Sequence, residues 1–185
     1  MLQFKIQIKD IKKPPVWRRV VVPETFTFHR FHEVIQAAFG WENYHLYQFS
    51  SQGWGSEERI TLPSDDDWEP VIDSTKEKLK DILKKEGQTY TYIYDFGDSW
   101  MHKITLEKIT DEKSLKASCI AGKGACPPED CGGIWGYEGI KELFETEPES
   151  DETNEFREWL GLEDDENWDP NLFDLGVANE EVMRV

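Results

Sequence analysis

Residues 89–109, TYTYIYDFGDSWMHKITLEKI, are the stretch that decides the fold. Tyr90, Tyr92, Tyr94 and Phe96 alternate with other residues and so share one face of a predicted strand over 89–96. Gly97-Asp98 predicts a tight turn, and 100–109 predicts a second strand that returns beside the first. The stretch therefore predicts an antiparallel β-hairpin with an aromatic face.

The rest of the chain adds strands on both sides of this hairpin and helices between them. Thr27 predicts the start of a helix and Gly40 its end, around an apolar stripe that includes Phe28, Phe31 and Ile35. The expected strands are 3–9, 16–22, 45–50, 58–62 and 115–120, and the expected helices are 28–39, 75–85, 137–145 and 153–160. Hairpin connections predict an α+β fold: a mostly antiparallel sheet with helices packed on one side.

Two segments carry signals of irregular structure. Residues 63–73 are rich in Pro and Asp, and 121–133, AGKGACPPEDCGG, combine two Pro with four Gly, so both are expected to be loops. Residues 161–185 predict an acidic, irregular C-terminal segment packed on the domain, with a last helical turn starting at Asn179. No internal repeat or linker divides the chain, which predicts a single domain over 1–185.

Charge is distributed unevenly along the 185 residues. The formal net charge is −17, with 38 Asp and Glu against 21 Lys and Arg. Residues 1–50 hold seven basic and four acidic residues, whereas 131–185 hold three basic and seventeen acidic ones. The total disfavours a protein that grips nucleic acid broadly through phosphates. It leaves room for a local basic contact near the N-terminus, and for the acidic C-terminal segment to pack against that region.

The sequence disfavours both a membrane protein and a secreted protein. No run of about 18 apolar residues is present, and the N-terminus MLQFKIQIKD alternates polar and apolar residues, unlike a signal peptide. Three cysteines, an odd number in a chain of this size, fit a reducing compartment. We therefore expect a cytoplasmic protein.

Four blocks of the sequence resemble one known family. They are VWRRV at 16–20, FHEVIQAAFGWENYHLYQF at 31–49, YIYDFGDSWMHKITLE at 92–107 and CIAGKGACPPEDCGGIWGY at 119–137. They are similar to the signature blocks of the plasmid pRiA4b ORF-3-like family over nearly the whole chain. The resemblance implies an uncharacterised protein, associated in some members with plasmids or insertion elements. It implies no reaction.

The cysteines of the last block raise a metal hypothesis. Cys126 and Cys131 have the C-x4-C spacing of zinc ligands, with Cys119 and a distant His102 as the remaining candidates. Partly buried free thiols are the competing interpretation. Gly122 and Gly124 around Lys123 resemble a phosphate-binding loop only weakly, because Pro127 and Pro128 separate them from any helix start.

Carboxylates give a second site hypothesis. Asp95 and Asp98 bracket the hairpin turn, and Glu129 and Asp130 lie in the Pro-rich loop, so two acidic pairs could hold Mg²⁺ or divide acid and base work. Ordinary turn and capping chemistry is the competing interpretation, with Glu129 or Asp130 pairing with Arg18 or Arg19. Beyond these zinc and magnesium hypotheses the sequence predicts no cofactor.

The four histidines are further candidates. His32, His45 and His102 lie, with Asp95 and Glu129, in the blocks that resemble the family, so a functional cluster is expected to draw on these five residues. His29, His32 and Glu33 share the first predicted helix, with His32 on its apolar flank, so a core or boundary role is expected for His32. His102 is expected to point inward beside Ile104 and Leu106. The list of candidates therefore divides into catalytic (Asp95, Asp98, His102, Glu129, Asp130), binding (Arg18, Arg19, His32, His45) and metal-ligating (Cys119, Cys126, Cys131, His102).

Two features of the sequence are typical of nucleic-acid-binding proteins. Tyr90, Tyr92 and Tyr94 could stack bases from one strand face, but the acidic neighbours and the expected helix cover favour a core role. A basic patch for DNA would comprise Lys12, Lys13, Arg18, Arg19 and Arg30.

Three functions follow from these residues. The leading interpretation is a non-enzymatic binding or interaction module with an unknown protein or small-molecule partner, because no complete catalytic motif is present. The second is a metal- or carboxylate/His-dependent enzyme with a site at the 95–102 hairpin and the 119–133 loop. The third is a DNA accessory factor of a mobile element.

Overall fold

The predicted hairpin lies at the centre of the sheet. In the computed structural model, which describes residues 1–65, 67, 69–163 and 166–185, β6 (Thr89–Tyr94) pairs antiparallel with β7 (Trp100–Ile109). Tyr92 faces His102 across the pair. Tyr92 and Tyr94 are fully buried and Tyr90 is 5% exposed, which confirms the predicted aromatic face for the three tyrosines. Phe96 lies beyond the end of β6 and is exposed, so its predicted place on this face is wrong.

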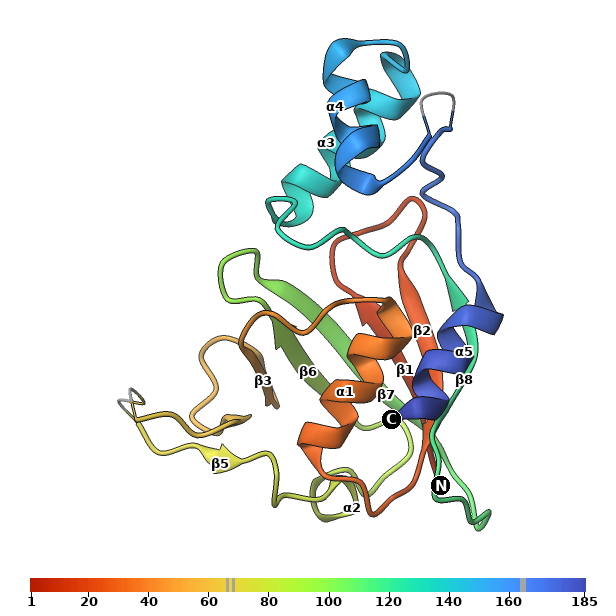
Figure 1. Ribbon diagram of the computed structural model, residues 1–185. Coiled ribbons are helices and arrows are strands. Elements are labelled where there is room, and N and C mark those ends of the chain that lie inside the picture. Colours follow the sequence, from red (N-terminus) through yellow and green to blue (C-terminus); the bar gives the residue numbers. More distant parts are fainter. Residues whose placement is uncertain (66, 68, 164–165) are drawn as a thin grey trace.

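Strands extend this hairpin on both sides into one twisted sheet (Figure 1). Within the described residues the sheet has eight strands in the order β5-β4-β3-β6-β7-β1-β2-β8. Every neighbouring pair is antiparallel except β4 and β5, which run parallel. The further strands are β1 (Leu2–Ile8), β2 (Trp17–Val22), β3 (Tyr47–Ser50), β4 (Ile60–Thr61), β5 (Ile72–Asp73) and β8 (Ser118–Lys123).

One face of the sheet is covered by α1 (Phe28–Phe39) and α5 (Leu175–Arg184), which lie side by side (Figure 1). Alternation in β1 aims Phe4, Ile6 and Ile8 at the helices, and the Phe4 ring lies 4.8 Å from that of Phe31 in α1. The Thr27 hydroxyl accepts the Arg30 N–H at the start of α1, and Gly40 ends it in a left-handed conformation. The α+β prediction is confirmed.

Two further helices form a separate lobe above one end of the sheet (Figure 1). They are α3 (Gly133–Thr146) and α4 (Asp151–Leu160), which contact each other. From this lobe the chain descends past the sheet to α5. On that path Phe173 packs against the Arg18 guanidinium at 4.2 Å from its ring centroid, so the acidic C-terminal segment meets the basic N-terminal region here.

Several element predictions are wrong. The predicted helix 75–85 reduces to α2 (Leu79–Ile82), because the preceding backbone pairs with the segment before α1: the Phe28 N–H donates to Glu77 O and the Leu79 N–H to Phe26 O. The expected loop 63–73 ends in β5, and its positions 66 and 68 lie outside the described residues.

The boundaries of the 121–133 loop and of the C-terminal segment also differ from expectation. Residues 121–123 continue β8, since Ala121, Gly122 and Lys123 pair with β2, and α3 already begins at Gly133. A Cβ on Gly122 would lie 2.5 Å from the Phe173 ring, which explains this glycine by close packing rather than by phosphate binding. The C-terminal segment, apart from positions 164 and 165 outside the described residues, is not irregular throughout, because Asp174 caps α5 by accepting the Val177 N–H.

A buried polar network links α1 to the sheet. His32 contacts the Tyr92 hydroxyl through Nδ1 at 2.8 Å and Asn43 Oδ1 through Nε2 at 2.7 Å. Gln36 donates to the same Tyr92 hydroxyl and accepts the Asn43 N–H. These bonds satisfy polar groups inside the core and hold the chain that follows α1 in place.

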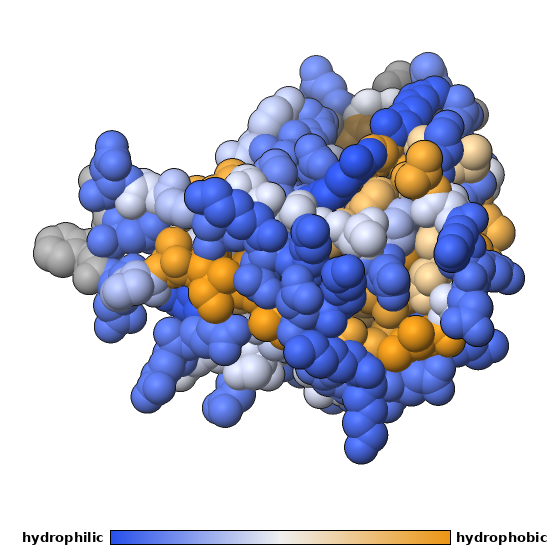
Figure 2. Space-filling model, turned by 90° about the horizontal axis from the view of Figure 1, so that it is seen from below, coloured by the Kyte–Doolittle hydropathy of each residue, from blue (hydrophilic) through white to orange (hydrophobic). Residues whose placement is uncertain are grey.

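The face of the molecule seen from below is mainly hydrophilic, with hydrophobic patches among the hydrophilic residues (Figure 2). No helix among the described residues has the length and apolar character needed to cross a bilayer.

The buried histidines predict a pH-dependent stability. Burial lowers the pKa of His32 and of His102 to about 3, from an ordinary value of 6.5. Between these values the unfolded chain binds more protons than the native one, so the unfolding free energy falls as pH falls below about 6.5. Urea denaturation at pH 7 and pH 5 should show a loss of about 2 kcal/mol for each buried histidine.

His102→Phe, which keeps a ring, should reduce this pH 7-to-5 loss by about 2 kcal/mol. Ile104→Val in the same strand leaves both histidines in place and should lower stability equally at both pH values. An unchanged pH dependence in His102→Phe would show that His102 is not a neutral core residue.

Candidate functional site

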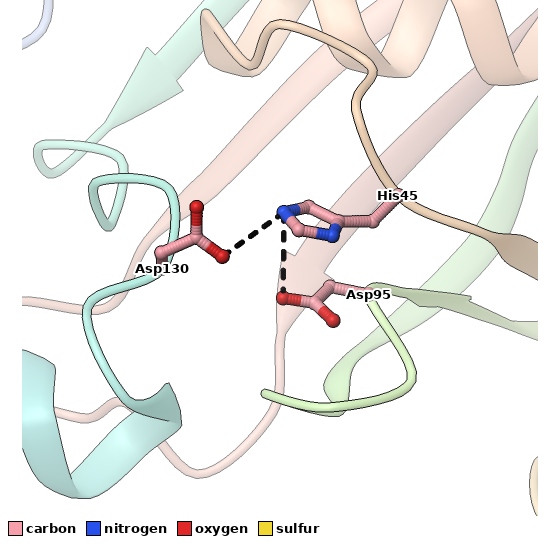
Figure 3. Close-up of side chains that lie close together, drawn as sticks. All are labelled: His45, Asp95 and Asp130. Carbon is pink, nitrogen blue, oxygen red and sulfur yellow. Dashed lines mark ion pairs between the residues drawn. The ribbon is translucent and has the colours of Figure 1, made fainter.

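Three loops meet at one end of the central strands. They are residues 41–46 after α1, residues 95–99 between β6 and β7, and residues 124–132 between β8 and α3. Each contributes a chemically active side chain: His45 from the first, Asp95 from the second, and Glu129 with Asp130 from the third (Figure 3 labels His45, Asp95 and Asp130). We call these four residues the His45 cluster.

Glu129 holds the third loop over the other two. Its Oε1 accepts the Tyr94 hydroxyl and the Glu42 backbone N–H, each at 2.9 Å. A third bond runs from Trp41 Nε1 to Pro127 O at 3.0 Å. The Glu129 side chain is thereby fixed, and its second oxygen, Oε2, faces His45 at 3.8 Å.

Asp95 is fixed by the turn that it starts. Its Oδ1 accepts the Gly97 N–H at 2.8 Å, and its backbone oxygen accepts the Ser99 N–H. The predicted two-residue Gly-Asp turn is therefore wrong: a five-residue loop, 95–99, joins the strands, because the Asp95 side chain stabilises a wider turn with Asp95 and Ser99 at positive φ. The turn leaves Asp95 Oδ2 free to face His45.

His45 Nε2 is the point on which the carboxylates converge. It lies 3.2 Å from Asp130 Oδ1, 3.8 Å from Asp95 Oδ2 and 3.8 Å from Glu129 Oε2 (Figure 3 shows the two aspartates). His45 Nε2 and Glu129 Oε2 are both buried without a hydrogen-bond partner. Buried polar atoms are normally satisfied, so these two call for a bound group or proton between them.

The spacing of these atoms suits a divalent cation. Ligand atoms around a tetrahedral ion at 2.0–2.2 Å lie about 3.3–3.6 Å apart, close to the three distances from His45 Nε2. Potential ligand atoms of His45, Asp95 and Asp130 all lie within 4.8 Å of one another. Asp130 is the exposed member, with 71% of its side chain accessible, whereas Asp95 and Glu129 are at 9% and 15%. The cluster is thus enclosed on one side and open on the other.

Asp98, the remaining carboxylate candidate, has a structural role. Its Oδ2 accepts the Gly132 N–H at 3.1 Å, at the start of α3, where Gly132 itself offers no capping side chain. A carboxylate stabilises the positive end of a helix. A Cβ on Gly136 would lie 1.6 Å from Cys131 O, so only glycine allows the loop to close against α3.

Two predicted site histidines lie elsewhere. His102 is fully buried, with its Nδ1 on Trp100 O and its ring edge-on to Phe39 and Trp41. The proposed grouping of His102 with Asp95 and Glu129 is therefore wrong. His32 is likewise fully buried and occupied by the polar network, which confirms the core role and removes it from the binding candidates.

The cysteines do not come together as ligands. Among the described residues, no cysteine belongs to a group of three or more potential ligands that meet at one point. All three are free thiols. Burial raises the pKa of Cys119 and Cys126 above the ordinary range and that of Cys131 to about 12, so the groups are neutral at pH 7 and poor nucleophiles.

The predicted basic patch is divided by the fold. Arg18 is buried and donates to Ala38 O, Trp17 O and Lys123 O. Arg19 makes a bidentate bond with Glu107, not with Glu129 or Asp130, and Arg30 donates to Val185 O. Arg18 and Arg19 are therefore structural, and of the predicted patch Lys12, Lys13 and Arg30 are exposed.

The tyrosine platform is also excluded. Tyr90, Tyr92 and Tyr94 are at most 5% exposed, because α1 covers their face of the sheet. The sequence grouped His45 with Asp95 and Glu129 only through their positions in three of the four similarity blocks. It gave no sign that they meet, because the three belong to loops whose approach depends on the sheet order.

Comparisons with known proteins find similar sequences and a similar solved structure. The sequence model of the plasmid pRiA4b ORF-3-like proteins matches residues 1–177. Uncharacterized protein y4hQ of Sinorhizobium fredii is 34% identical over 184 residues, which cover 98% of this chain and 92% of that protein. The crystal structure of MM3350, a protein of unknown function from Methanosarcina mazei, has a TM-score of 0.77 and 37% identity, covering 95% of this chain and 94% of that one.

The contacts of Glu129 predict the effect of a single hydroxyl. Tyr94→Phe removes the donor to Glu129 Oε1 and the acceptor of the Tyr44 N–H. We expect the unfolding free energy to fall by about 1.5–3 kcal/mol, as for other hydrogen bonds to charged groups. Tyr44→Phe, at a side chain that is 71% exposed, is the matched control and should change it by less than about 0.5 kcal/mol. Equal effects of the two variants in urea denaturation would contradict the role given to Tyr94.

Proposed function

Since this chain belongs to the plasmid pRiA4b ORF-3-like family, whose described relatives have no assigned activity, we propose a function from the His45 cluster itself: binding of a divalent metal ion. The ion is held by His45 Nε2 and by oxygens of Asp95, Glu129 and Asp130. The proposal departs from the cysteine-based zinc hypothesis and keeps the carboxylate/His hypothesis, with His45 in place of His102.

One observation supports this proposal above the others. His45 Nε2 and Glu129 Oε2 are buried, face each other at 3.8 Å and have no hydrogen-bond partner. A metal ion between them would satisfy both atoms and offset the negative charge of three carboxylates, which would otherwise repel one another. The competing occupant is a proton: a charged His45 would make ion pairs with the same oxygens.

The donor set indicates the kind of ion. Carboxylate oxygens coordinate Mg²⁺, Mn²⁺ and Zn²⁺, whereas an imidazole ligand favours transition metals over Mg²⁺. We therefore propose Mn²⁺ or Zn²⁺ as the preferred ions. The exposed Asp130 side leaves room for water or a ligand oxygen to complete the coordination.

Two activities are compatible with such an ion. A bound water would become more acidic and could attack a substrate, as the enzyme interpretation requires. A bound ligand oxygen would instead anchor a partner, as the binding interpretation requires. We favour binding, because exposed apolar side chains adjoin the His45 cluster.

The rim of the cluster supports a protein partner. The two side chains that flank His45 in the sequence are exposed: Tyr44 is 71% accessible and Leu46 67%. The Trp54 ring packs edge-on against Phe96 at 5.0 Å and donates to Ser99 of the hairpin loop. Exposed aromatic residues around a polar centre are typical of interaction sites. A cytoplasmic location is part of this proposal and is supported by the three free thiols.

Metal titration tests the proposal. Isothermal titration of chelator-treated protein with MnCl₂, ZnCl₂ and MgCl₂ at pH 7.5 should give one site. Mn²⁺ or Zn²⁺ should bind at least about tenfold more tightly than Mg²⁺, because of the imidazole ligand. His45→Ala should weaken the binding of the preferred ion at least about tenfold.

His29→Ala is the matched control, since His29 is partly exposed on α1 and contacts the Tyr47 hydroxyl instead of the cluster. It should leave the metal affinity unchanged. Absence of binding at one site in the unmodified protein, or the same loss in both variants, would reject the proposal.

A further inference from the structure

A basic groove lies apart from the His45 cluster, between the β1–β2 turn, the end of β8 and the α3–α4 lobe. Its volume is about 630 Å³. Four lysines line it, Lys12 and Lys13 from the β1–β2 turn, Lys123 from β8 and Lys141 from α3, against a single lining acid, Glu145, among the described residues. We call it the lysine groove.

This local charge is opposite to that of the whole chain. The protein carries a net charge of −17, and the lobe that forms one wall of the groove comes from its most acidic third. Lys141 is held by Glu138 at 2.7 Å with 12% of its side chain exposed, and its ammonium lies 5.4 Å from the Tyr137 ring. Lys12, Lys13 and Lys123 make no such ion pair among the described residues, and gathering these three from two separate segments favours an anionic ligand, because like charges brought together repel unless they are neutralised.

The floor of the groove supplies a different chemistry. Trp168 and Phe144 line it beside Pro170 and Asn171. The Trp168 ring is held in place by an edge-on contact with Tyr137 at 5.5 Å. A flat apolar surface beside an amide suits a heteroaromatic ring, which can stack on the indole and bond at its edge.

We propose that the lysine groove binds a nucleotide, with its phosphates on the lysines and its base against Trp168. The volume lies within the range of about 300–1,000 Å³ typical of small-molecule sites. Lys123, which the sequence suggested only weakly as part of a phosphate loop, contributes here through its side chain rather than through the flanking glycines. The site is independent of the metal proposed at the His45 cluster.

Titration with ATP in the presence of EDTA tests this inference without metal at the other site. The full chain should bind ATP at one site, and tripolyphosphate and adenosine should each bind at least about threefold more weakly. Lys12→Glu combined with Lys13→Glu should weaken ATP binding roughly tenfold or more, since two phosphate contacts become repulsive. Trp168→Leu should bring ATP affinity down to that of tripolyphosphate.

A matched control makes the same charge change elsewhere. Lys84→Glu with Lys85→Glu alters two exposed lysines outside the groove and should change ATP affinity less than about twofold. No ATP binding, or equal losses in the two double variants, overturns the nucleotide site. If tripolyphosphate binds as tightly as ATP, the proposed contact between the base and Trp168 is wrong. If a dT12 oligonucleotide binds more tightly than ATP and this binding depends on the lysines, the ligand is single-stranded DNA rather than a nucleotide.

Discussion

The two hydrogen bonds of Glu129 Oε1 are the constraint on which the site depends. The Tyr94 hydroxyl and the Glu42 N–H both donate to this oxygen, which joins the end of a central strand, the chain after α1 and the Pro-rich loop. With one oxygen fixed in this way, the other can only face His45. Carboxylates that ligate metal ions are commonly fixed by hydrogen bonds, so a carboxylate with one oxygen bonded and the other unpartnered is suited to bind a cation.

The fold supports this constraint from below and from the side. Below, the network of His32, Gln36 and Tyr92 fixes Asn43, two residues before His45. To the side, Asp98 accepts the Gly132 N–H at the start of α3 and so anchors the far end of the Pro-rich loop. The polar residues that the sequence suggested as catalytic therefore have two different roles. Some hold the loops in place, and others are held by the loops at the candidate metal site.

The central hairpin, the first helix and the antiparallel sheet were predictable from the sequence, because apolar periodicity and capping residues such as Thr27 act locally. The short α2 was not predictable, since backbone pairing with 26–28 replaces most of the helix that its pattern favours. The α3 start was also missed, because Gly133, one of the glycines that suggest a loop, is required there for close packing against the Asp98 backbone.

The site was harder to predict for a related reason: long-range contacts bring its residues together, and the local sequence pattern does not show such contacts. Asp95, Glu129 and Asp130 were identified as candidates from residue type alone. His102 was a candidate partner because it lies in a similarity block, and alternation along β7 turns it into the core, as the apolar face of that strand predicted. His45 takes that place because β3 pairs with β6, a relation that depends on the sheet order.

The most direct test of the central claim is the position of the ion. A crystal of the protein grown with MnCl₂ and measured for anomalous scattering should show one peak about 2.0–2.3 Å from His45 Nε2, with Asp95, Glu129 and Asp130 oxygens around it. An ordered site without a peak, in which His45 Nε2 instead donates a hydrogen bond to Asp130, would contradict the account and identify the group between these carboxylates as a proton.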